Sequence, residues 1–364
     1  MENFNKNEII SYKKNVQCYG VVSDDLESDL ETLKGMIFKY KSIPSVIIAG
    51  KNYKTFKINT EIDVKDGNKI ILVTNQMLSK RFFIFKVEID LLFDYFSYVD
   101  ILRHFVPSEC MIGAYETVGD IIHLNLTEKQ NKYKEIIGFV LFKKTGKTVI
   151  NKIGNIDNVY RNYNCEVLEK KDGFVDLKTI VVECNVKMVV DLENVYWSGR
   201  LQNERKMLYE TILNSSQPKS VCDLFCGVGP HVLPLLKAGY EIFANDLNAN
   251  AIECLKESLK LNKLQCKNIY NMDADLFINN IRNIEIGHFI FNLPEYSLIY
   301  LKLFLERYEY NGCMIHCYFF VKEHENLTEL VERVSGIKIT ENILIKFVRD
   351  VSPSKKVYKM QFIK

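Results

Sequence analysis

Apolar and polar residues alternate differently on the two sides of residue 194. Beyond that point, helix-like segments separate short apolar runs. In one such segment, 248–263, apolar residues recur at 251, 252, 255 and 259, a spacing that places them on one helix face. The apolar runs cover residues 221–229, 240–246, 268–275, 288–294 and 312–321. This alternation predicts an α/β fold, with a parallel sheet covered by helices on both faces.

Upstream of residue 194, strand-like runs are more closely spaced. The middle region has runs at 119–126, 136–144, 147–153, 180–186 and 187–192. The first region combines a helix-like stretch, 23–41, with short strand-like runs at 45–50 and 69–74. At the other end of the chain, two runs at 342–351 and 355–364 predict a hairpin at the sheet edge. We therefore expect three domains, comprising residues 1–98, 99–193 and 194–364.

The composition is that of a folded protein without a strong overall charge. Of the 364 residues, 47% are hydrophobic, and the net charge is +2. This is enough apolar material for two or three domains, but the net charge gives no sign of nucleic-acid binding. Residues 128–152 are locally basic, with seven lysines against two acids. A solvated sheet face is slightly favoured for them, and phosphate contact is the other interpretation.

Ten cysteines are present, and none forms a C-x-x-C pair. Free thiols are therefore favoured over a zinc site. The polar N-terminus lacks the apolar segment of a signal peptide, and no apolar run is long enough for a transmembrane helix. We expect a protein of the cytoplasm, a reducing compartment, and leave nuclear and mitochondrial pools open.

The sharpest local motif is a glycine loop after an apolar strand. The strand ends at Asp223, and the chain turns through Gly227 and Gly229 into a helix. Glycines at such a turn let the backbone approach a ligand. Asp246 ends the next strand, 17 residues after Gly229, where a carboxylate can accept both hydroxyls of a ribose. Asp273 follows the third strand and suits an adenine amino group, although strand-end capping explains Asp223 and Asp273 equally simply.

The loop indicates S-adenosylmethionine rather than a dinucleotide. Val232 occupies the position of the third glycine in G-x-G-x-x-G, and that glycine serves helix–strand packing under a pyrophosphate. S-adenosylmethionine has no phosphates and needs only the open loop with polar groups nearby. An NAD-dependent oxidoreductase is therefore disfavoured.

Two further segments carry candidate chemistry. The fourth strand ends in Asn292-Leu293-Pro294, where an amide can meet a planar base, or where a turn simply closes the strand. Before the α/β region, Arg200 and Glu204 are spaced i, i+4 on one predicted helix face. Spacing alone favours a surface ion pair. The functional interpretation is a general base at Glu204, oriented by Arg200 or Arg205.

In combination, these motifs resemble the archaeal–eukaryotic tRNA (guanine-37-N1) methyltransferase family. The resemblance rests on VYWSGRLQNER, DLFCGVGP, ANDLN and NLP in this order, with ILRHFVP, VGDIIHLNL and FVRDVSPSKK similar as well. It covers roughly residues 99–364. It implies a Rossmann-type S-adenosylmethionine methyltransferase domain preceded by two smaller α+β domains that contact tRNA, in a monomer without an obligate protein partner, metal or membrane.

The resemblance also implies individual roles. Glu204 would be the general base, and Arg161 would lie beside O6 of the target guanine. Asn292 and Pro294 would hold the base, and Tyr196 would shape the pocket. The implied cofactor-binding residues are Arg200, Asp223, Phe225, Gly227, Gly229, Asp246, Leu247, Asn248, Asp273, Ala274 and Asn292.

The expected reaction is methyl transfer from S-adenosylmethionine to N1 of guanine 37 in the tRNA anticodon loop. One alternative is the wybutosine-pathway enzyme that transfers the aminocarboxypropyl group of the same cofactor. Another is a non-catalytic tRNA-binding protein with a relic cofactor fold. The Asn-Leu-Pro motif favours the first over the second, and the presence of Asp246, Glu204 and Asn292 argues against the third.

Overall fold

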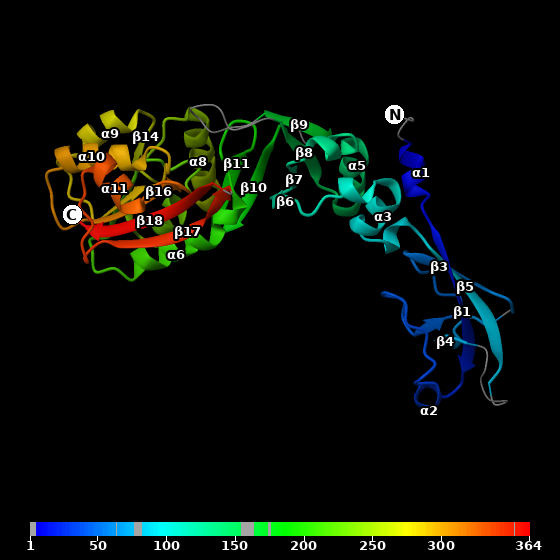
Figure 1. Ribbon diagram of the computed structural model, residues 1–364. Coiled ribbons are helices and arrows are strands. Elements are labelled where there is room, and N and C mark those ends of the chain that lie inside the picture. The colour runs from blue at the N-terminus through cyan, green and yellow to red at the C-terminus, as the bar shows by residue number, and fades with distance from the viewer. Residues whose placement is uncertain (1–4, 63, 76–81, 154–163, 174–175, 353) are drawn as a thin grey trace. The chain divides into compact units, whose positions relative to one another are not determined.

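The computed structural model describes residues 5–62, 64–75, 82–153, 164–173, 176–352 and 354–364. Within them the chain forms two compact units (Figure 1). The first unit comprises residues 1–114, 126–149 and 168–171, and the second comprises 115–125, 150–167 and 172–364. Residues of the middle region are thus found in both units. None of the described helices has the length and apolarity needed to cross a membrane.

The first unit combines an antiparallel sheet with short helices. Its strands are β1 (Lys14–Ser23), β2 (Val46–Ile48), β3 (Phe56–Thr60), β4 (Lys69–Val73) and β5 (Ile84–Leu91), paired in the order β2-β4-β1-β5-β3. Its helices are α1 (Lys6–Ile10), α2 (Leu26–Thr32), η1 (Phe93–Tyr95), α3 (Tyr98–Phe105), η2 (Ser108–Cys110), α4 (Glu128–Asn131) and α5 (Lys134–Thr145). The predicted strand-like runs at 45–50 and 69–74 are confirmed as β2 and β4.

Two predictions for this unit are wrong. The helix expected over 23–41 ends at Thr32, because the chain beyond Gly35 pairs with β4, where the N–H of Phe38 donates to the carbonyl of Leu72. The strand expected at 136–144 is helix α5, whose central residues are buried all round. A continuous apolar run carries no period, so it does not separate strand from helix. Gly146, with φ +67°, ends α5 as a left-handed cap.

The same correction changes the interpretation of the lysine-rich stretch, residues 128–152. Lys129 lies in α4, and Lys134, Lys143 and Lys144 lie in α5. The interpretation of these lysines as one face of a sheet is therefore wrong. Only Lys152 falls in a strand, β8 (Thr148–Ile153).

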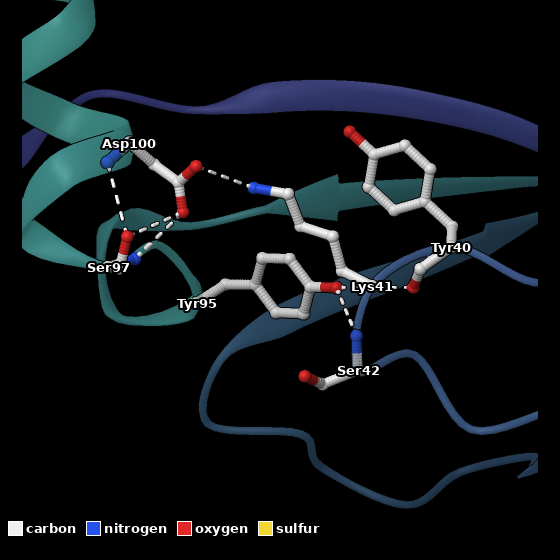
Figure 2. A network of polar contacts seen from close by, with 6 residues as sticks. All are labelled: Tyr40, Lys41, Ser42, Tyr95, Ser97 and Asp100. Carbon is white, nitrogen blue, oxygen red and sulfur yellow. Dashed lines mark hydrogen bonds and ion pairs between the residues drawn. The ribbon is translucent and has the colours of Figure 1, made fainter.

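A network of polar contacts joins the loop before β2 to η1 and to the start of α3 (Figure 2). The Nζ of Lys41 lies 3.0 Å from Oδ1 of Asp100, a residue in the capping box that begins α3. The hydroxyl of Tyr95 accepts a hydrogen bond from the N–H of Ser42 at 3.1 Å and donates to the carbonyl of Tyr40 at 3.4 Å. Lys144 donates to the carbonyl of Phe93 at 2.6 Å. The junction between β5 and α3 is thus held from both α5 and the loop before β2.

The second unit contains the parallel sheet. Its strands are β12 (Ser220–Asp223), β13 (Glu241–Asn245), β14 (Asn268–Tyr270), β15 (His288–Phe291), β16 (Met314–Lys322), β17 (Leu344–Ser352) and β18 (Lys355–Ile363). They pair in the order β14-β13-β12-β15-β16-β18-β17. The first five are parallel, and β18 and β17 form the predicted antiparallel hairpin at the edge, red in Figure 1. The predicted Rossmann-type fold is confirmed.

Helices cover both faces of this sheet because its strands are apolar on both sides. They are η3 (Gly199–Leu201), α6 (Gln202–Leu213), α7 (Val232–Lys237), α8 (Ala249–Asn262), α9 (Ala274–Ile281), α10 (Ser297–Arg307) and α11 (Leu327–Ser335). Successive residues of a strand enter opposite cores. Val221 packs in the core with α6, α7 and α8, whereas Cys222 packs in the core with α9, α10 and α11. The hairpin of β10 (Lys178–Glu183) and β11 (Val186–Asp191) packs on α8.

The remaining strands form a separate four-stranded sheet. It has the order β6-β7-β8-β9. Strands β7 (Ile121–Leu124) and β9 (Asn164–Glu169) flank β8, and β6 (Glu116–Val118) pairs with β7. The runs predicted at 119–126 and 147–153 are confirmed as β7 and β8.

Candidate active site

The order of the strands in the parallel sheet indicates where a ligand would bind. The chain first places β13 and β14 on one side of β12, and then returns to place β15 on the other side of β12. Ligands of open α/β sheets bind outside the carboxyl ends of the strands at such a reversal. Asp223 ends β12, and Asn292 directly follows β15. The two therefore lie on adjacent strand ends at this position.

The glycine loop has the conformation that its sequence predicts. Gly227 has φ +53° and Gly229 has φ +88°, values that favour glycine. A Cβ on Gly229 would lie 2.5 Å from Cδ1 of Leu255, so this glycine lets the loop pack against α8. A Cβ on Gly227 would meet no atom within 4 Å. The loop is therefore open at Gly227, the point where a ligand would approach.

Asp246 accepts a backbone hydrogen bond on each carboxylate oxygen, one from the glycine loop and one from the turn before α8. The N–H of Gly227 donates to Oδ2 at 2.8 Å, and the N–H of Asn248 donates to Oδ1 at 2.9 Å. Burial raises the pKa of Asp246 above its usual value, and these two hydrogen bonds oppose the rise. A carboxylate has about four lone-pair sites, so the side chain retains capacity for two hydroxyl donors. Leu247, beside it, is exposed.

Asp223 carries an unsatisfied buried oxygen. The residue is 1% exposed, and Oδ1 accepts a hydrogen bond from the N–H of Phe225 at 3.2 Å. Among the described residues, Oδ2 has no hydrogen-bond partner. Burial, helped by the charge of Asp246, raises the pKa of Asp223 to about 7. A cationic ligand group next to Oδ2 would offset the desolvation of this carboxylate.

Asn245 was not singled out from the sequence, yet it ties three strand ends together. Its Nδ2 donates to the carbonyls of Leu224 and Met272, and its Oδ1 accepts from the N–H of Met272. Asp273 caps α9, accepting the N–H of Asp275 at 2.8 Å, and buried Ala274 is the first residue of that helix. Capping, the simpler explanation for Asp273, is thus present in the structure.

Glu204 lies in the first turn of α6 and faces the sheet. The hydroxyl of Tyr318 donates to its Oε1 at 2.8 Å, and Nζ of Lys359 lies 2.7 Å from the same oxygen. The side chains of Glu204 and Lys359 are only 14% and 4% exposed. The surface ion pair that spacing favoured is therefore not formed, and Arg200 is exposed.

The expectation that Arg200 or Arg205 orients Glu204 is also wrong. Arg205 instead forms a buried bidentate pair with Glu183, in which Nε donates to Oε2 at 2.8 Å and Nη2 donates to Oε1 at 2.7 Å. It also donates to the carbonyl of Ser198 and lies over the ring of Trp197 at 4.6 Å. Consecutive helix residues point about 100° apart, so Glu204 and Arg205 enter different environments.

Tyr318 and Lys359 were missed because they are distant in sequence. They are directly paired residues of the antiparallel strands β16 and β18. A lysine within the apolar run KVYKMQF was the only available signal for this buried charge. Burial, followed by the charge of Glu204, raises the pKa of Tyr318 well above its usual value, so the phenol stays a hydrogen-bond donor.

The Asn-Leu-Pro turn lies against the same strand. The N–H of Phe320, two residues after Tyr318, donates to the carbonyl of Pro294 at 3.1 Å. The N–H of Leu293 donates to Oγ of Ser297 at 3.0 Å. Through β16, the structure brings Glu204 and this turn to one rim of the sheet.

The other candidates lie around this rim or outside the described residues. Tyr196 is 40% exposed, in the loop before η3. That loop is fixed by the N–H of Gly199, which donates to Oε1 of Glu116 at 2.6 Å. Phe225 is half-buried, with its ring 5.3 Å from that of Tyr300. Arg161 lies outside the described residues.

Comparison with known proteins agrees with this geometry. The family model for the TRM5/TYW2 methyltransferase domain matches residues 179–344, and that for the TYW2 N-terminal domain matches residues 98–169. The tRNA (guanine(37)-N(1))-methyltransferase of Encephalitozoon cuniculi is 38% identical over 360 residues, covering 97% of each chain. That of Dictyostelium discoideum is 32% identical over 346 residues, covering 89% of this chain and 73% of the relative.

Solved structures show the same fold. A complex of aTrm5 with tRNALeu superposes with a TM-score of 0.67 at 21% identity, covering 96% of this chain and 99% of that one. Trm5b from Pyrococcus abyssi has a TM-score of 0.61 at 23% identity, with the same coverage. This chain therefore belongs to the TRM5/TYW2 methyltransferase family and, within it, to the tRNA (guanine(37)-N(1))-methyltransferases.

Proposed function

We propose that this protein transfers a methyl group from S-adenosylmethionine to N1 of guanine 37 in the anticodon loop of tRNA. One observation carries the proposal: Glu204, a carboxylate fixed by Tyr318 and Lys359, lies at the same rim as the Asn292 turn. The names of the relatives support this choice of substrate and position.

The residues at the strand ends fit S-adenosylmethionine. Asp246 would accept the ribose hydroxyls, and Asp273 with Ala274 would meet the adenine. The unpartnered Oδ2 of Asp223 suits the ammonium group at the amino-acid end, and the loop is open at Gly227. Arg200, Phe225, Leu247 and Asn248 complete the proposed cofactor set. When bound there, the cofactor supplies a methyl group already activated by a sulfonium charge.

Glu204 is proposed to remove the N1 proton of guanine. N1 carries a hydrogen and is a poor nucleophile until that proton leaves. Because Tyr318 and Lys359 both meet Oε1, Oε2 is the oxygen that would receive it. Fixing the base in this way contributes orientation as well as proton transfer.

Removal of the proton builds negative charge on O6 of the guanine. A guanidinium beside that oxygen would stabilise it, and the resemblance assigns this role to Arg161. Asn292 and Pro294 would hold the base, and Tyr196 would shape the pocket. A base that leaves the loop stack costs a few kcal/mol. We propose that contacts of the two upstream domains, 1–98 and 99–193, with tRNA offset that cost, while 194–364 carries the reaction.

The proposed function is tested by mapping the modified nucleotide in tRNA after reaction with the purified protein. 1-Methylguanosine at position 37 is expected, and its absence from every guanine would favour a tRNA-binding protein without activity. Glu204→Gln should lower the methylation rate by a factor on the order of 10² to 10⁴ while cofactor binding survives. Unchanged turnover would remove Glu204 from the mechanism.

Aminocarboxypropyl transfer is the second candidate, because the family model matching residues 98–169 is that of the TYW2 N-terminal domain. The sulfur product separates the two reactions. Methyl transfer leaves S-adenosylhomocysteine, whereas aminocarboxypropyl transfer leaves methylthioadenosine.

We further propose that the protein is a monomer of the cytoplasm, with nuclear and mitochondrial pools left open. Light scattering of the purified protein tests the monomer, and fractionation of cells tests the location.

A further inference from the structure

His231 lies next to the proposed base-binding turn, and no step described above uses it. The residue is 5% exposed and directly precedes α7. Its Nε2 lies 3.4 Å from Nδ2 of Asn292. The two residues come from adjacent strand ends, because His231 follows the glycine loop after β12 and Asn292 follows β15.

The direction of this hydrogen bond follows from chemistry. The amide nitrogen of asparagine only donates, so Nε2 of His231 must accept. Burial, together with the charges of Arg205 and Lys359, lowers the pKa of His231 to about 3. The imidazole is therefore neutral near pH 7. A neutral ring has one nitrogen without hydrogen, and the contact with Asn292 assigns that nitrogen to Nε2.

The bond removes one remaining freedom of the Asn292 side chain. Hydrogen bonds of Leu293 and Pro294 already fix the backbone of the turn. They leave the terminal torsion of Asn292 unset, and that torsion is broad and roughly two-fold. Its two orientations exchange the amide oxygen and nitrogen. With Nε2 unprotonated, only the orientation with Nδ2 toward His231 forms the bond, whereas the tautomer protonated on Nε2 would pair with Oδ1.

We propose that His231 is a positioning residue that holds the Asn292 amide in one orientation for recognition of guanine. The proposal rests on the function proposed above and deepens it. Guanine presents both an acceptor, O6, and N–H donors on its pairing edge. Asn292 then presents Oδ1 as acceptor and its second N–H as donor in fixed directions. An inverted amide would set donor against donor and acceptor against acceptor.

The test is a double-mutant cycle between His231 and Asn292. His231→Phe keeps a ring of similar size and removes the acceptor. In the wild-type background it should lower kcat for tRNA about tenfold, the size of one neutral hydrogen bond, without changing the Kd for S-adenosylmethionine. In the Asn292→Ala background it should have no further effect. His231→Gln, which restores an acceptor oxygen, should return kcat to within about threefold of wild type.

Other results of the cycle would overturn the proposal. A wild-type kcat in His231→Phe, or an equal loss in both backgrounds, would mean that His231 does not act through Asn292. A loss that appears only in the Kd of the cofactor would point to a structural role of the loop. Matched thermal unfolding of the variants shows whether any loss reflects folding.

A second measurement does not depend on activity or on folding of a variant. The ¹⁵N spectrum of the wild-type protein with labelled histidine should show His231 neutral, with Nε2 unprotonated and Nδ1 protonated. The opposite tautomer, or a charged ring at pH 7, would refute the assignment. Absence of methylguanosine in tRNA treated with the wild-type protein would instead contradict the proposed function and leave this spectrum as the deciding readout for His231.

Discussion

The buried pair of Glu183 and Arg205 offers a sharp prediction about stability. Their side chains are only 6% and 8% exposed, and two hydrogen bonds of 2.8 and 2.7 Å join them. Glu183→Gln keeps the size of the side chain but leaves the guanidinium buried without its counter-charge. Breaking a buried pair from one side costs about 3–5 kcal/mol. We expect the free energy of unfolding of the second unit to fall by that amount.

This loss in the free energy of unfolding lowers the midpoint of thermal unfolding, Tm, by a measurable amount. For a unit of this size, 1 kcal/mol shifts the Tm by roughly 2–4 °C. The lower end of the expected range therefore corresponds to a decrease of about 6–12 °C. Trp197 is the single tryptophan of the chain, and Arg205 lies 4.6 Å from its ring. Tryptophan fluorescence during heating thus reports on unfolding at this pair.

Glu253→Gln is the matched control. Glu253 pairs with Lys256 at 2.8 Å, but both side chains are more than half exposed, and exposed pairs contribute little. The same chemical change should therefore leave the Tm unchanged there. If Glu183→Gln shifts the Tm no more than Glu253→Gln does, the energetic argument for the buried pair fails.

Three further predictions concern Lys359, His288 and Gly229. Lys359→Met removes a charge-assisted hydrogen bond to Glu204, so kcat for tRNA should fall about 10- to 100-fold; a kcat within twofold of wild type would refute the role of this lysine. Burial lowers the pKa of His288 to about 4, below about 6.5 in the unfolded chain. The unfolded state therefore binds more protons between these values. The contribution of His288 to stability should be complete above pH 6.5 and be lost by up to about 1.4 kcal/mol per pH unit toward pH 4, in addition to the losses from His231 and His316, whose pKa values burial also lowers. Urea midpoints at pH 7 and pH 5 test this, and His288→Phe should flatten the fall. Gly229→Ala places a Cβ against Leu255 at φ +88°, so calorimetric affinity for S-adenosylmethionine should decrease at least tenfold, whereas unaltered affinity would show that the loop tolerates it.

Periodicity predicted the second unit well because its elements are long and alternate regularly. The glycine loop, the strand-end acids and the terminal hairpin all follow from local sequence. Helix α5 was mistaken for a strand because its apolar residues are consecutive, and those from Ile137 to Leu141 are buried on every side. The lysines and Gly146 that follow them are the better signal, since they mark a helix end.

The partners of Glu204 could not be predicted in the same way. Tyr318 is 114 residues away along the chain, and only the pairing of β16 with β18 brings it to Lys359. Spacing within a helix suggested Arg200, because local sequence reveals only helical neighbours such as those at i, i+4. The actual partners depend on strand order, which no local pattern encodes.

The junction between β5 and α3 (Figure 2) has a consequence for how the sequence can vary. Tyr95 bonds to main-chain atoms of residues 40 and 42, and every amino acid offers the carbonyl used at 40, while every residue except proline offers the N–H used at 42. Side chains at these two positions are therefore free to drift over evolution without loss of the Tyr95 bonds. The tyrosine hydroxyl itself has no such freedom, since one substitution there removes both.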